Sequence, residues 1–432
     1  MRYQEAIAYL EELTKFGINL GLARIARLLE LLGNPHEKLS FIHIAGTNGK
    51  GSTAAMVAGI LQEAGYRVGL YTSPHLVEYT ERFRLDGEDI RPEELADLIT
   101  TLKPLLNRMV AEGDEQPTEF EVLTAAAALY FAREQADVVV WEAGLGGAID
   151  STNVVTPRVS VITNVSMDHK DYLGNTVEEI ARVKAGIVKP GVPVVTAAAD
   201  PAALEVVAGV CRQQAALLWR VGREVQVRDL VRQDEGLRFA VHLPGAFYAD
   251  LFLRLAGEHQ AVNAACAVAA VELLRPHGFS FSQDSVRRGL EGVYPPGRIE
   301  IISAEPTVIL DVAHNPEAAG ALARVLAHDF PHCRVILVLG ILADKDRPEI
   351  VARLAPLAQA VVVTRPNSPR AGDWHQVAAL AAAFVDPVYV EENIPAAVSL
   401  ALTLAGPQGA VCVAGSFYVV GEVKKFWAQR GF

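Results

Sequence analysis

The chain has 432 residues, of which 51% are hydrophobic, and a formal net charge of −12 at pH 7. This length predicts two or three domains with buried cores, and the negative charge argues against nucleic acid as a partner, because binding a phosphate backbone needs a basic surface. No apolar run reaches the roughly 18 residues of a membrane span, and the N-terminus is charged and amphipathic without an apolar signal core. We therefore expect a cytoplasmic protein.

The cysteines are scattered and show neither CxxC nor CxxH spacing. They are Cys211, Cys266, Cys333 and Cys412. This pattern argues against a zinc site and against a disulfide framework. Free, buried thiols are the expected state.

The N-terminal third begins with a helical region and then a phosphate-loop pattern. Residues 3–32 predict two helices around a turn at residues 16–21. Residues 41–44 alternate as a strand does, residues 46–53 are rich in glycine and hydroxyl groups, and residues 54–64 predict a helix. Strand, glycine-rich loop and helix in this order are typical of a site that binds the phosphates of ATP.

The loop itself carries the groups that such chemistry needs. Its glycines let backbone N–H groups converge on phosphate oxygens, Lys50 supplies a positive charge, and Ser52 or Thr53 offers a hydroxyl near a metal ion. The usual pattern G-x-x-x-x-G-K-[ST] is not met, because position 44 is Ile and Gly51 separates Lys50 from Ser52. A glycine-rich turn can also be only a tight connection, but the run Thr-Asn-Gly-Lys-Gly-Ser in this context favours phosphate binding.

Three predicted strands end in polar side chains. The strands at residues 67–72, 137–141 and 159–163 lead to Ser73, Glu142 and Asp168-His169. The carboxyl ends of parallel strands are where open α/β sheets bind ligands, and hydroxyl, carboxylate and imidazole groups beside a phosphate loop suit Mg²⁺. Singly, each residue has a simpler explanation as a turn cap, a solvated strand end or a histidine at the edge of the core. The two arginines of the ERFR segment (81–84) are expected on a solvated face.

Two helices have capping boxes at their starts. Thr118 and Glu121 precede a helix at 122–133, and Thr176 and Glu179 precede a second helix. In the second helix Lys184 shares the face of Val177, Ile180 and Ile187. Burial on an apolar face lowers the pKa of a lysine, so Lys184 is expected to have a partly neutral amine.

The remaining chain predicts an antiparallel insertion and then a second α/β domain. Segments between residues 221 and 255 alternate as antiparallel strands do, and the turn residues at 294–297 mark the main domain boundary. Beyond them, strands and helices alternate, which indicates a second parallel sheet covered on both faces. The predicted strands lie at residues 307–311, 334–340, 360–364, 387–390 and 410–416.

The motifs NLGLARI, HIAGTNGKGST, YTSPHL, ERFR, EFEVLTA, EAGLGG, MDHKDYLG, KAGIVK, PPGRIE, DVAHNP, DKD and GSFYVVGEV run along nearly the whole chain. Together they resemble the folylpolyglutamate synthase and dihydrofolate synthase family of the Mur ligase superfamily. The phosphate loop with Gly after Lys and the DVAHNP motif are the specific parts of this resemblance.

The resemblance implies an α/β fold of two domains with a cleft between them: a P-loop parallel-sheet domain at 1–296, which binds ATP and folate, and a smaller Rossmann-like glutamate-ligase domain at 297–432. It implies that the two domains close on the substrates. We expect a monomer.

The resemblance also implies roles for individual residues. The ATP contacts are Thr47, Asn48, Gly49, Lys50, Gly51, Ser52, Asn263, Arg298 and Asp311, the last three closing on ATP from the far side of the cleft together with His314. The Mg²⁺ ligands are Ser73, Glu142 and His169. The pteroate contacts are Asn19, Leu20, Gly21, Thr118, Glu119, Phe120, Glu121, Asp150, Ser151 and Thr152, although Asn19 stands where a family member has Asp. Lys184 is expected to be carbamylated.

The implied reaction joins L-glutamate to dihydropteroate and to reduced folates at the expense of ATP. The substrate carboxylate attacks the γ-phosphate, and the glutamate amine then attacks the acyl phosphate. His314 is a candidate base for the amine, with a contact to the ATP ribose or phosphate as its alternative role. Alternative hypotheses for the function are a ligase of the UDP-muramoyl peptide or cyanophycin type and, in a different class, a P-loop kinase or regulatory ATPase.

Overall fold

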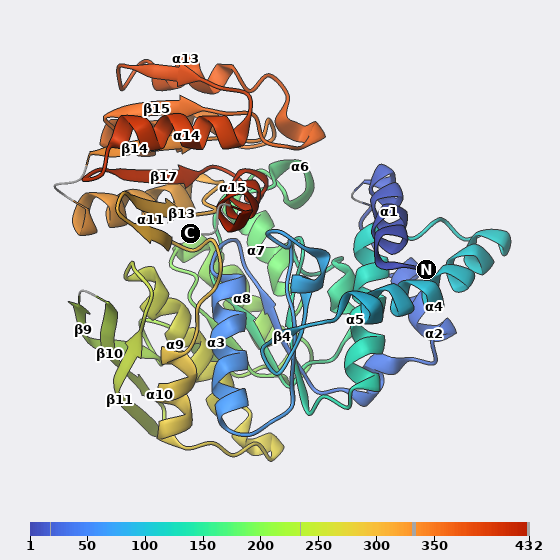
Figure 1. The fold of residues 1–432 in the computed structure, drawn as a ribbon. Coiled ribbons are helices and arrows are strands. Elements are labelled where there is room, and N and C mark those ends of the chain that lie inside the picture. The colour runs from blue at the N-terminus through green and yellow to red at the C-terminus, as the bar shows by residue number, and fades with distance from the viewer. Residues whose placement is uncertain (18, 234, 331–333, 430–432) are drawn as a thin grey trace. The chain divides into compact units, whose positions relative to one another are not determined.

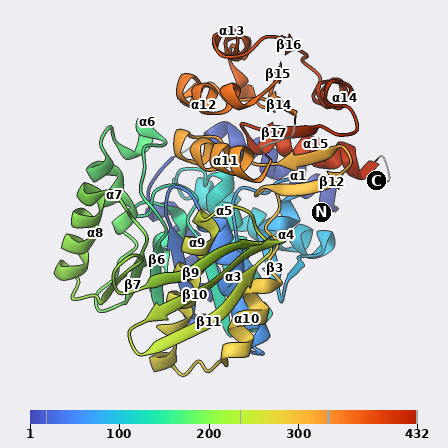
Figure 2. The same cartoon turned by 90° about the vertical axis from the view of Figure 1, so that its left-hand side faces the viewer.

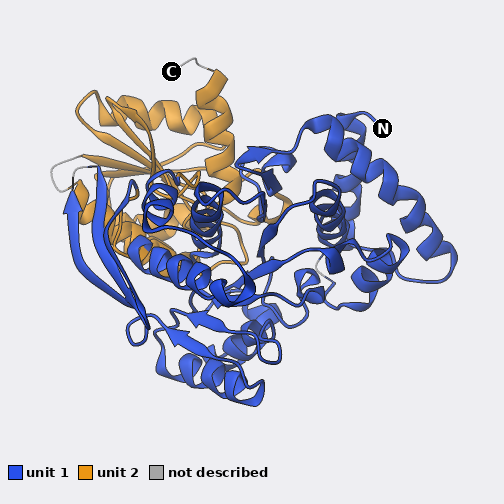
Figure 3. Ribbon diagram, turned by 90° about the horizontal axis from the view of Figure 1, so that it is seen from below, with its two compact units in different colours: residues 1–254, 260–293 blue, residues 255–259, 294–432 orange. Residues whose placement is uncertain are grey.

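The computed structural model describes residues 1–432 except 18, 234, 331–333 and 430–432. The chain divides into two compact units, unit 1 (residues 1–254 and 260–293) and unit 2 (residues 255–259 and 294–432), coloured blue and orange in Figure 3. The division after residue 293 differs from the expected boundary at 296/297, and residues 255–259 belong with unit 2. No helix among the described residues is long and apolar enough to cross a membrane.

Unit 1 is built on an eight-stranded sheet in the order β4-β3-β2-β5-β1-β6-β7-β8. Its edge strand β4 and several of its helices are labelled in Figure 1. Its strands are β1 (Phe41–Ala45), β2 (Val68–Tyr71), β3 (Phe83–Leu85), β4 (Glu88–Asp89), β5 (Val138–Glu142), β6 (Val159–Ile162), β7 (Val194–Thr196) and β8 (Leu218–Arg220). Six adjacent strands pair in parallel, namely β2, β5, β1, β6, β7 and β8. Strands β3 and β4 add an antiparallel edge next to β2. The buried strands are rich in valine and isoleucine, as expected for a parallel sheet covered on both faces.

The helices of unit 1 are α1 (Tyr3–Leu13), α2 (Ala23–Leu31), α3 (Lys50–Glu63), α4 (Pro92–Ala111), α5 (Glu119–Arg133), α6 (Lys170–Leu173), α7 (Val177–Ala185), α8 (Pro201–Gln213), α9 (His259–Glu272) and α10 (Gln283–Glu291). Helix α3 packs on β1, β2 and β5. A single core joins α1, α2, α4 and α5 to Phe41 and Trp141 of the sheet. The expected antiparallel insertion is confirmed as β9 (Gln226–Gln233), β10 (Gly236–Leu243) and β11 (Ala246–Leu253), which lie side by side in Figure 2.

Unit 2 has a six-stranded sheet in the order β12-β13-β17-β14-β15-β16. Its strands are β12 (Glu300–Ala304), β13 (Thr307–Leu310), β14 (Val335–Leu339), β15 (Ala360–Val363), β16 (Val388–Val390) and β17 (Ala410–Ala414). Its helices are α11 (Pro316–Asp329), α12 (Arg347–Leu354), α13 (Gln376–Ala381), α14 (Ile394–Ala405) and α15 (Phe417–Gln429). The five predicted strands are present and parallel, but the expectation of a wholly parallel sheet was wrong, since β12 pairs antiparallel with β13.

Several local predictions need correction. Helix α3 begins at Lys50 rather than Ala54, because Gly49 serves as its N-cap. The reciprocal capping box at Thr118 and Glu121 is confirmed, and α5 begins at Glu119. At Thr176 only one half of the box forms, because Glu179 accepts the N–H of Asn175 instead.

The expectations for the N-terminal turn and the thiols can be compared only where the structure describes them. Residue 18, within the expected turn, and Cys333 lie outside the described residues. The other three cysteines are free and buried, as predicted.

Candidate active site

The phosphate loop lies between the end of β1 and the start of α3. Gly46 and Gly49 have φ angles of 153° and 80°, a region that favours glycine. A Cβ atom at Gly46 would lie 1.9 Å from Thr163 Oγ1, and one at Gly49 would lie 2.4 Å from Asn263 Oδ1. Both glycines are therefore required by close packing as well as by backbone conformation, and Asn263 lies beside the loop within unit 1.

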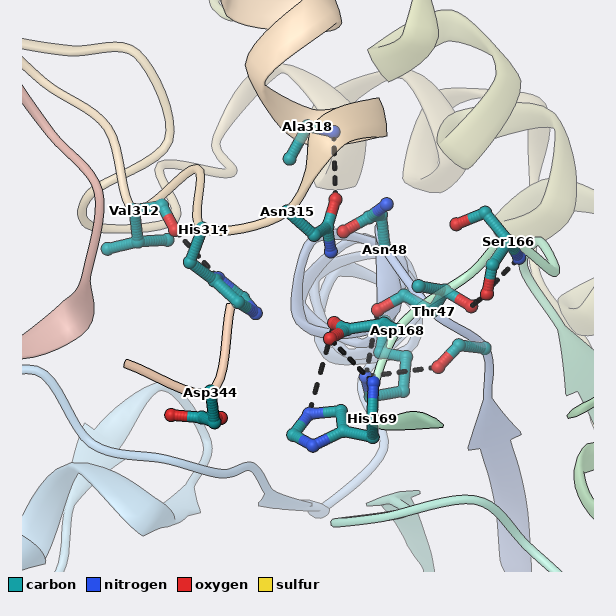
Figure 4. A network of polar contacts seen from close by, with 12 residues as sticks. Thr47, Asn48, Ser166, Asp168, His169, Val312, His314, Asn315, Ala318 and Asp344 are labelled. Atoms are coloured by element: carbon teal, nitrogen blue, oxygen red, sulfur yellow. Dashed lines mark hydrogen bonds and ion pairs between the residues drawn. The ribbon is translucent and has the colours of Figure 1, made fainter. Parts of the chain in front are cut away.

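The loop is fastened to the segment that follows β6. Asn164 Oδ1 accepts the N–H of Asn48 at 2.7 Å, and Thr163 Oγ1 donates to the carbonyl of Asn48 at 2.6 Å. Thr47 Oγ1 donates to the carbonyl of Ser166 at 3.1 Å and accepts the N–H of Ser166 at 3.0 Å (Figure 4). These bonds hold the loop backbone and the start of α3 in place, which an anion site built from main-chain N–H groups needs.

Two lysines are directed at this loop. Lys50 Nζ lies 3.2 Å from the carbonyl oxygen of Gly46 and 3.3 Å from that of Thr47. Lys184 Nζ donates to the Gly46 carbonyl at 2.9 Å, and its side chain is buried, as its place on the apolar face predicted. Burial, with a smaller effect of Lys50, lowers the pKa of Lys184 to about 7. Two lysines thus converge on one loop carbonyl, and one of them is a buried, partly neutral amine.

Two of the three predicted metal ligands are in direct contact. Glu142 is the last residue of β5, and its Oε2 accepts the N–H of Ser73 at 3.1 Å. A Cβ atom at Gly51 would lie 3.8 Å from Glu142 Oε2, so this buried carboxylate faces the phosphate loop. Hydroxyl and carboxylate oxygens at this place fit a hard cation such as Mg²⁺.

The third predicted ligand, His169, stands at the N-terminal end of α6 with a φ of 50°. Its N–H donates to Asp168 Oδ1 at 2.8 Å, and its Nε2 lies 3.9 Å from Asp168 Oδ2 (Figure 4). Across the described part of the chain, no group of three or more His, Cys, Asp or Glu side chains is arranged to hold a metal. A divalent ion at Glu142 would therefore need additional ligands, such as phosphate oxygens and water.

The three segments expected to contact pteroate come together in unit 1. Gly21 N–H donates to the carbonyl of Ile149 at 3.2 Å, which joins the N-terminal turn to the loop before Asp150. The ring of Phe120 packs against Gly144, where a Cβ atom would approach it to 2.5 Å. Arg24 links the N-terminal turn to the start of α5. Its Nη2 donates to the carbonyl of Asn19, and its Nε donates to both oxygens of Glu121 at 3.1 Å.

The polar groups of these segments are largely committed to one another. Asp150 Oδ2 accepts the N–H of Leu145 at 2.6 Å, and its Oδ1 accepts both the N–H of Thr152 at 3.0 Å and the Thr152 hydroxyl. Asp150 and Thr152 are buried, and burial raises the pKa of Asp150. The expected alternative roles, a helix cap for Thr118 and a turn for Asp150, are both present in the structure.

The expectation of a solvated face for the arginines of the ERFR segment was wrong for Arg82. Arg82 is 8% exposed, donates from Nε to His75 Nδ1 at 2.9 Å, and lies over the ring of Tyr79. Its Nη2 is 3.8 Å from Glu119 Oε1. Arg84 is partly exposed, with 27% of its side chain accessible, and pairs with Asp89. A buried guanidinium places positive charge within this acidic chain.

In unit 2, Arg298 and His314, two of the residues expected to close on ATP, lie beside the ring of Phe417. Arg298 lies over this ring at 5.5 Å, and the ring of His314 is 5.8 Å away from it. Asp311 accepts the N–H groups of Ile299 and Ala313 at 2.9 and 2.8 Å. Burial raises the pKa of Asp311 to about 6, against the opposing effect of Arg298.

The proton position on His314 follows from its hydrogen bond. Nδ1 lies 2.9 Å from the carbonyl of Val312 (Figure 4), and a carbonyl can only accept, so Nδ1 carries the proton. In the neutral ring Nε2 then has the lone pair, which a proton acceptor requires.

Comparison with known proteins connects this geometry to a family. The Mur ligase middle domain model matches residues 44–271, and the Mur ligase, glutamate ligase domain model matches residues 297–417. The dihydrofolate synthase/folylpolyglutamate synthase of Bacillus subtilis is 36% identical over 430 residues, which cover 98% of each protein. The chain belongs to the folylpolyglutamate synthase/dihydrofolate synthase family of the Mur ligase superfamily.

Solved structures of this synthase family share the fold. The folylpolyglutamate synthase of Mycobacterium tuberculosis, complexed with ADP, has a TM-score of 0.91 at 35% identity, covering 98% of this chain and 99% of the other. Escherichia coli FolC, complexed with DHPP and ADP, has a TM-score of 0.88 at 33% identity and covers 100% and 99%. The predicted family and α/β fold class are thereby confirmed.

Sequence reasoning missed several residues that support the site in this synthase family member. Asn164 and Thr163 hold the glycine-rich loop, Arg24 joins two of the segments expected to contact pteroate, and Phe417 packs beside Arg298 and His314. Asn164 could have been recognised, because it follows a buried strand as Ser73 does. Arg24 and Phe417 could not, since their partners are far away in the sequence.

Proposed function

We propose that this chain adds L-glutamate both to dihydropteroate and to the glutamate tail of reduced folates. Family membership makes it an ATP-dependent ligase that adds glutamate to folate substrates. The observation that carries the mechanism is the pair Lys50 and Lys184 on the Gly46 carbonyl, at the start of α3. The Bacillus subtilis relative and the Mycobacterium tuberculosis structure are named dihydrofolate synthase/folylpolyglutamate synthase and folylpolyglutamate synthase, which favours this activity over the muramoyl-peptide and kinase alternatives.

In the first step, the substrate carboxylate attacks the γ-phosphate of ATP to give an acyl phosphate and ADP. The protein forms no covalent bond to the phosphoryl group in such a transfer, so catalysis depends on positioning of the reactants and neutralisation of their charge. Main-chain N–H groups of residues 47–52 hold the phosphates, and Lys50 stabilises the charge of the transferred group. Asn263, Arg298 and Asp311 are proposed as further contacts to ATP.

Ser73, Glu142 and His169 would hold Mg²⁺, together with oxygens of the nucleotide and water. When bound, the ion neutralises phosphate charge. The support from this chain is the buried Glu142 carboxylate facing the loop at Gly51. The Ser73 N–H fixes that carboxylate through its Oε2.

Lys184 is proposed to be carbamylated. The ammonium first loses a proton, the neutral amine then attacks the carbon of CO₂, and the nitrogen releases a second proton, which gives a carbamate anion in place of a buried cation. A pKa of about 7 leaves a large neutral fraction at neutral pH, as this addition requires. The alternative is a lysine that remains an ammonium donating to Gly46.

In the second step, the amine of L-glutamate attacks the acyl phosphate, and phosphate leaves from the tetrahedral intermediate. The amine must be neutral to attack. His314 could accept its proton, since Nδ1–H donates to Val312 and leaves the lone pair on Nε2. A contact to the ATP ribose or phosphate is the competing role for His314.

We further propose a monomeric, cytoplasmic enzyme whose partners are ATP, L-glutamate, dihydropteroate and reduced folates. The test is to incubate the protein with ATP, Mg²⁺ and glutamate, and with either dihydropteroate or tetrahydrofolate, and to measure product masses. One added glutamate on each substrate, with ADP and phosphate released, supports the proposal. A phosphorylated end product would indicate a kinase, and ADP release that needs no glutamate would indicate a regulatory ATPase.

A further inference from the structure

Three polar side chains from neighbouring strands lie on one face of the unit 1 sheet. His43 of β1 pairs with Trp141 of β5 and with Ser160 of β6, and residues paired in this way point to the same face. All three are buried. Trp141 Nε1 donates to the carbonyl of Thr152 at 3.0 Å, and Ser160 Oγ donates to that of Ile187 at 3.1 Å. Trp141 thereby holds the main chain at Thr152, whereas Ser160 contacts a different segment.

The contact of His43 has a defined proton direction. His43 Nε2 lies 2.9 Å from Thr152 Oγ1, and that hydroxyl donates its only proton to Asp150 Oδ1. Thr152 must therefore accept from His43. Burial lowers the pKa of His43 to about 3, so the ring is neutral with a single N–H, located on Nε2. The result is an ordered series of donors from His43 through Thr152 to Asp150.

This arrangement leaves one atom unpaired. Nδ1 of His43 is buried and has no hydrogen-bond partner among the described residues. A buried acceptor without a partner destabilises the fold, and an apolar side chain in the middle of β1 would avoid that cost. The contact from Nε2 to Thr152 is therefore the feature that distinguishes histidine from an aliphatic residue at this position.

We infer that His43 is a positioning residue for the dihydropteroate site: its Nε2–H orients the Thr152 hydroxyl, which in turn fixes the Asp150 carboxylate. The inference rests on the proposed function, which assigns Asp150 to the pteroate substrate. The N–H groups of Leu145 and Thr152 hold the same carboxylate. The carboxylate thereby closes the loop from 145 to 152, and its orientation depends on a residue that itself does not contact the substrate.

The test uses His43→Leu, His43→Gln and Thr152→Val in the full-length protein. Removing the donor or the hydroxyl should raise the KM for dihydropteroate by about five- to tenfold, the effect of one lost hydrogen bond, while the KM for ATP stays unchanged. His43→Gln retains an N–H at the position of Nε2 and should restore most of the loss. The double variant His43→Leu/Thr152→Val should have the same KM for dihydropteroate as either single variant, because both substitutions remove the same contact.

Ser160→Ala is the matched control, because it removes a buried hydrogen bond on the same face that does not reach Thr152. It should lower the melting temperature without changing the KM for dihydropteroate. The inference is overturned if His43→Leu and Thr152→Val leave that KM unchanged, or if Ser160→Ala raises it equally. If His43→Leu does not fold, Thr152→Val and His43→Gln decide. Failure of the unmutated protein to use dihydropteroate would instead overturn the proposed dual function, and with it the substrate assignment.

Discussion

Lys50 and Lys184 donate to the same oxygen atom, the carbonyl of Gly46, at 3.2 and 2.9 Å. Lys50 begins α3, whereas Lys184 reaches the loop from α7 and is 3% exposed. Two cations on one carbonyl repel each other, and Lys50 contributes to the lowered pKa of Lys184. Phosphates of ATP or conversion of one amine to an anion would relieve this repulsion.

Lys50→Ala should reduce kcat by roughly a hundred- to thousandfold, because a preorganised positive charge on the transferred phosphoryl group is lost. The fold should persist, since the Lys50 side chain is only half-buried and α3 keeps its glycine N-cap. The measurement is phosphate release under saturating substrates, with circular dichroism as the check of folding. Lys38→Ala, at an exposed lysine, is the control and should retain full activity. A rate of phosphate release in Lys50→Ala equal to that of the unmutated protein would contradict the assignment of this loop to phosphate binding.

Lys184→Met should stabilise the protein at neutral pH in buffer free of CO₂. In the folded state the pKa of Lys184 is about 7, against 10.5 for an ordinary lysine, so the unfolded chain binds more protons between these values. Stability therefore rises with pH from about 7 to about 10.5 in the native protein, and this rise should be absent in Lys184→Met. At pH 7 the variant should gain on the order of a few kcal/mol in urea unfolding. Equal stability of the two proteins at pH 7 would contradict the burial of a cation.

Carbamylation of Lys184 should be visible as extra density beyond Nζ in crystals grown near neutral pH with bicarbonate. The same protein given ¹³C-labelled bicarbonate should show a carbamate carbon signal, and Lys184→Met should lack it. Density that ends in a bare ammonium under these conditions would count decisively against the modification.

Asp150→Ala should impair glutamate addition to dihydropteroate more than extension of tetrahydrofolate. The reason is that the carboxylate closes the loop from 145 to 152, which we assign to the pteroate substrate. Rates on both substrates and the melting temperature should be measured together, because Asp150 is buried and its loss also destabilises the loop. An equal loss on both substrates would argue against a dedicated pteroate site.

Much of the fold could be predicted from the sequence because its parallel strands are short apolar runs between helices. The strand ends at Ser73 and Glu142 and the buried face of Lys184 depend on local pattern, and the structure places them as expected. The glycine-rich loop is present but shorter than expected, because α3 already begins at Lys50. Edge strand β12 was missed because its residues are only partly buried and lack an apolar run. The burial of Arg82 could not be predicted either, since it depends on His75, Tyr79 and Glu119 in the folded chain.

The most direct test of the mechanism follows the oxygen atoms of the substrate carboxylate. Tetrahydrofolate whose reacting carboxylate carries ¹⁸O at both oxygens is incubated with the protein, ATP, Mg²⁺ and glutamate, and the released phosphate is analysed by mass spectrometry. If the carboxylate attacks the γ-phosphate and glutamate then displaces phosphate from carbon, each phosphate carries one ¹⁸O. Phosphate without ¹⁸O, formed together with the glutamylated product, would contradict an acyl-phosphate intermediate.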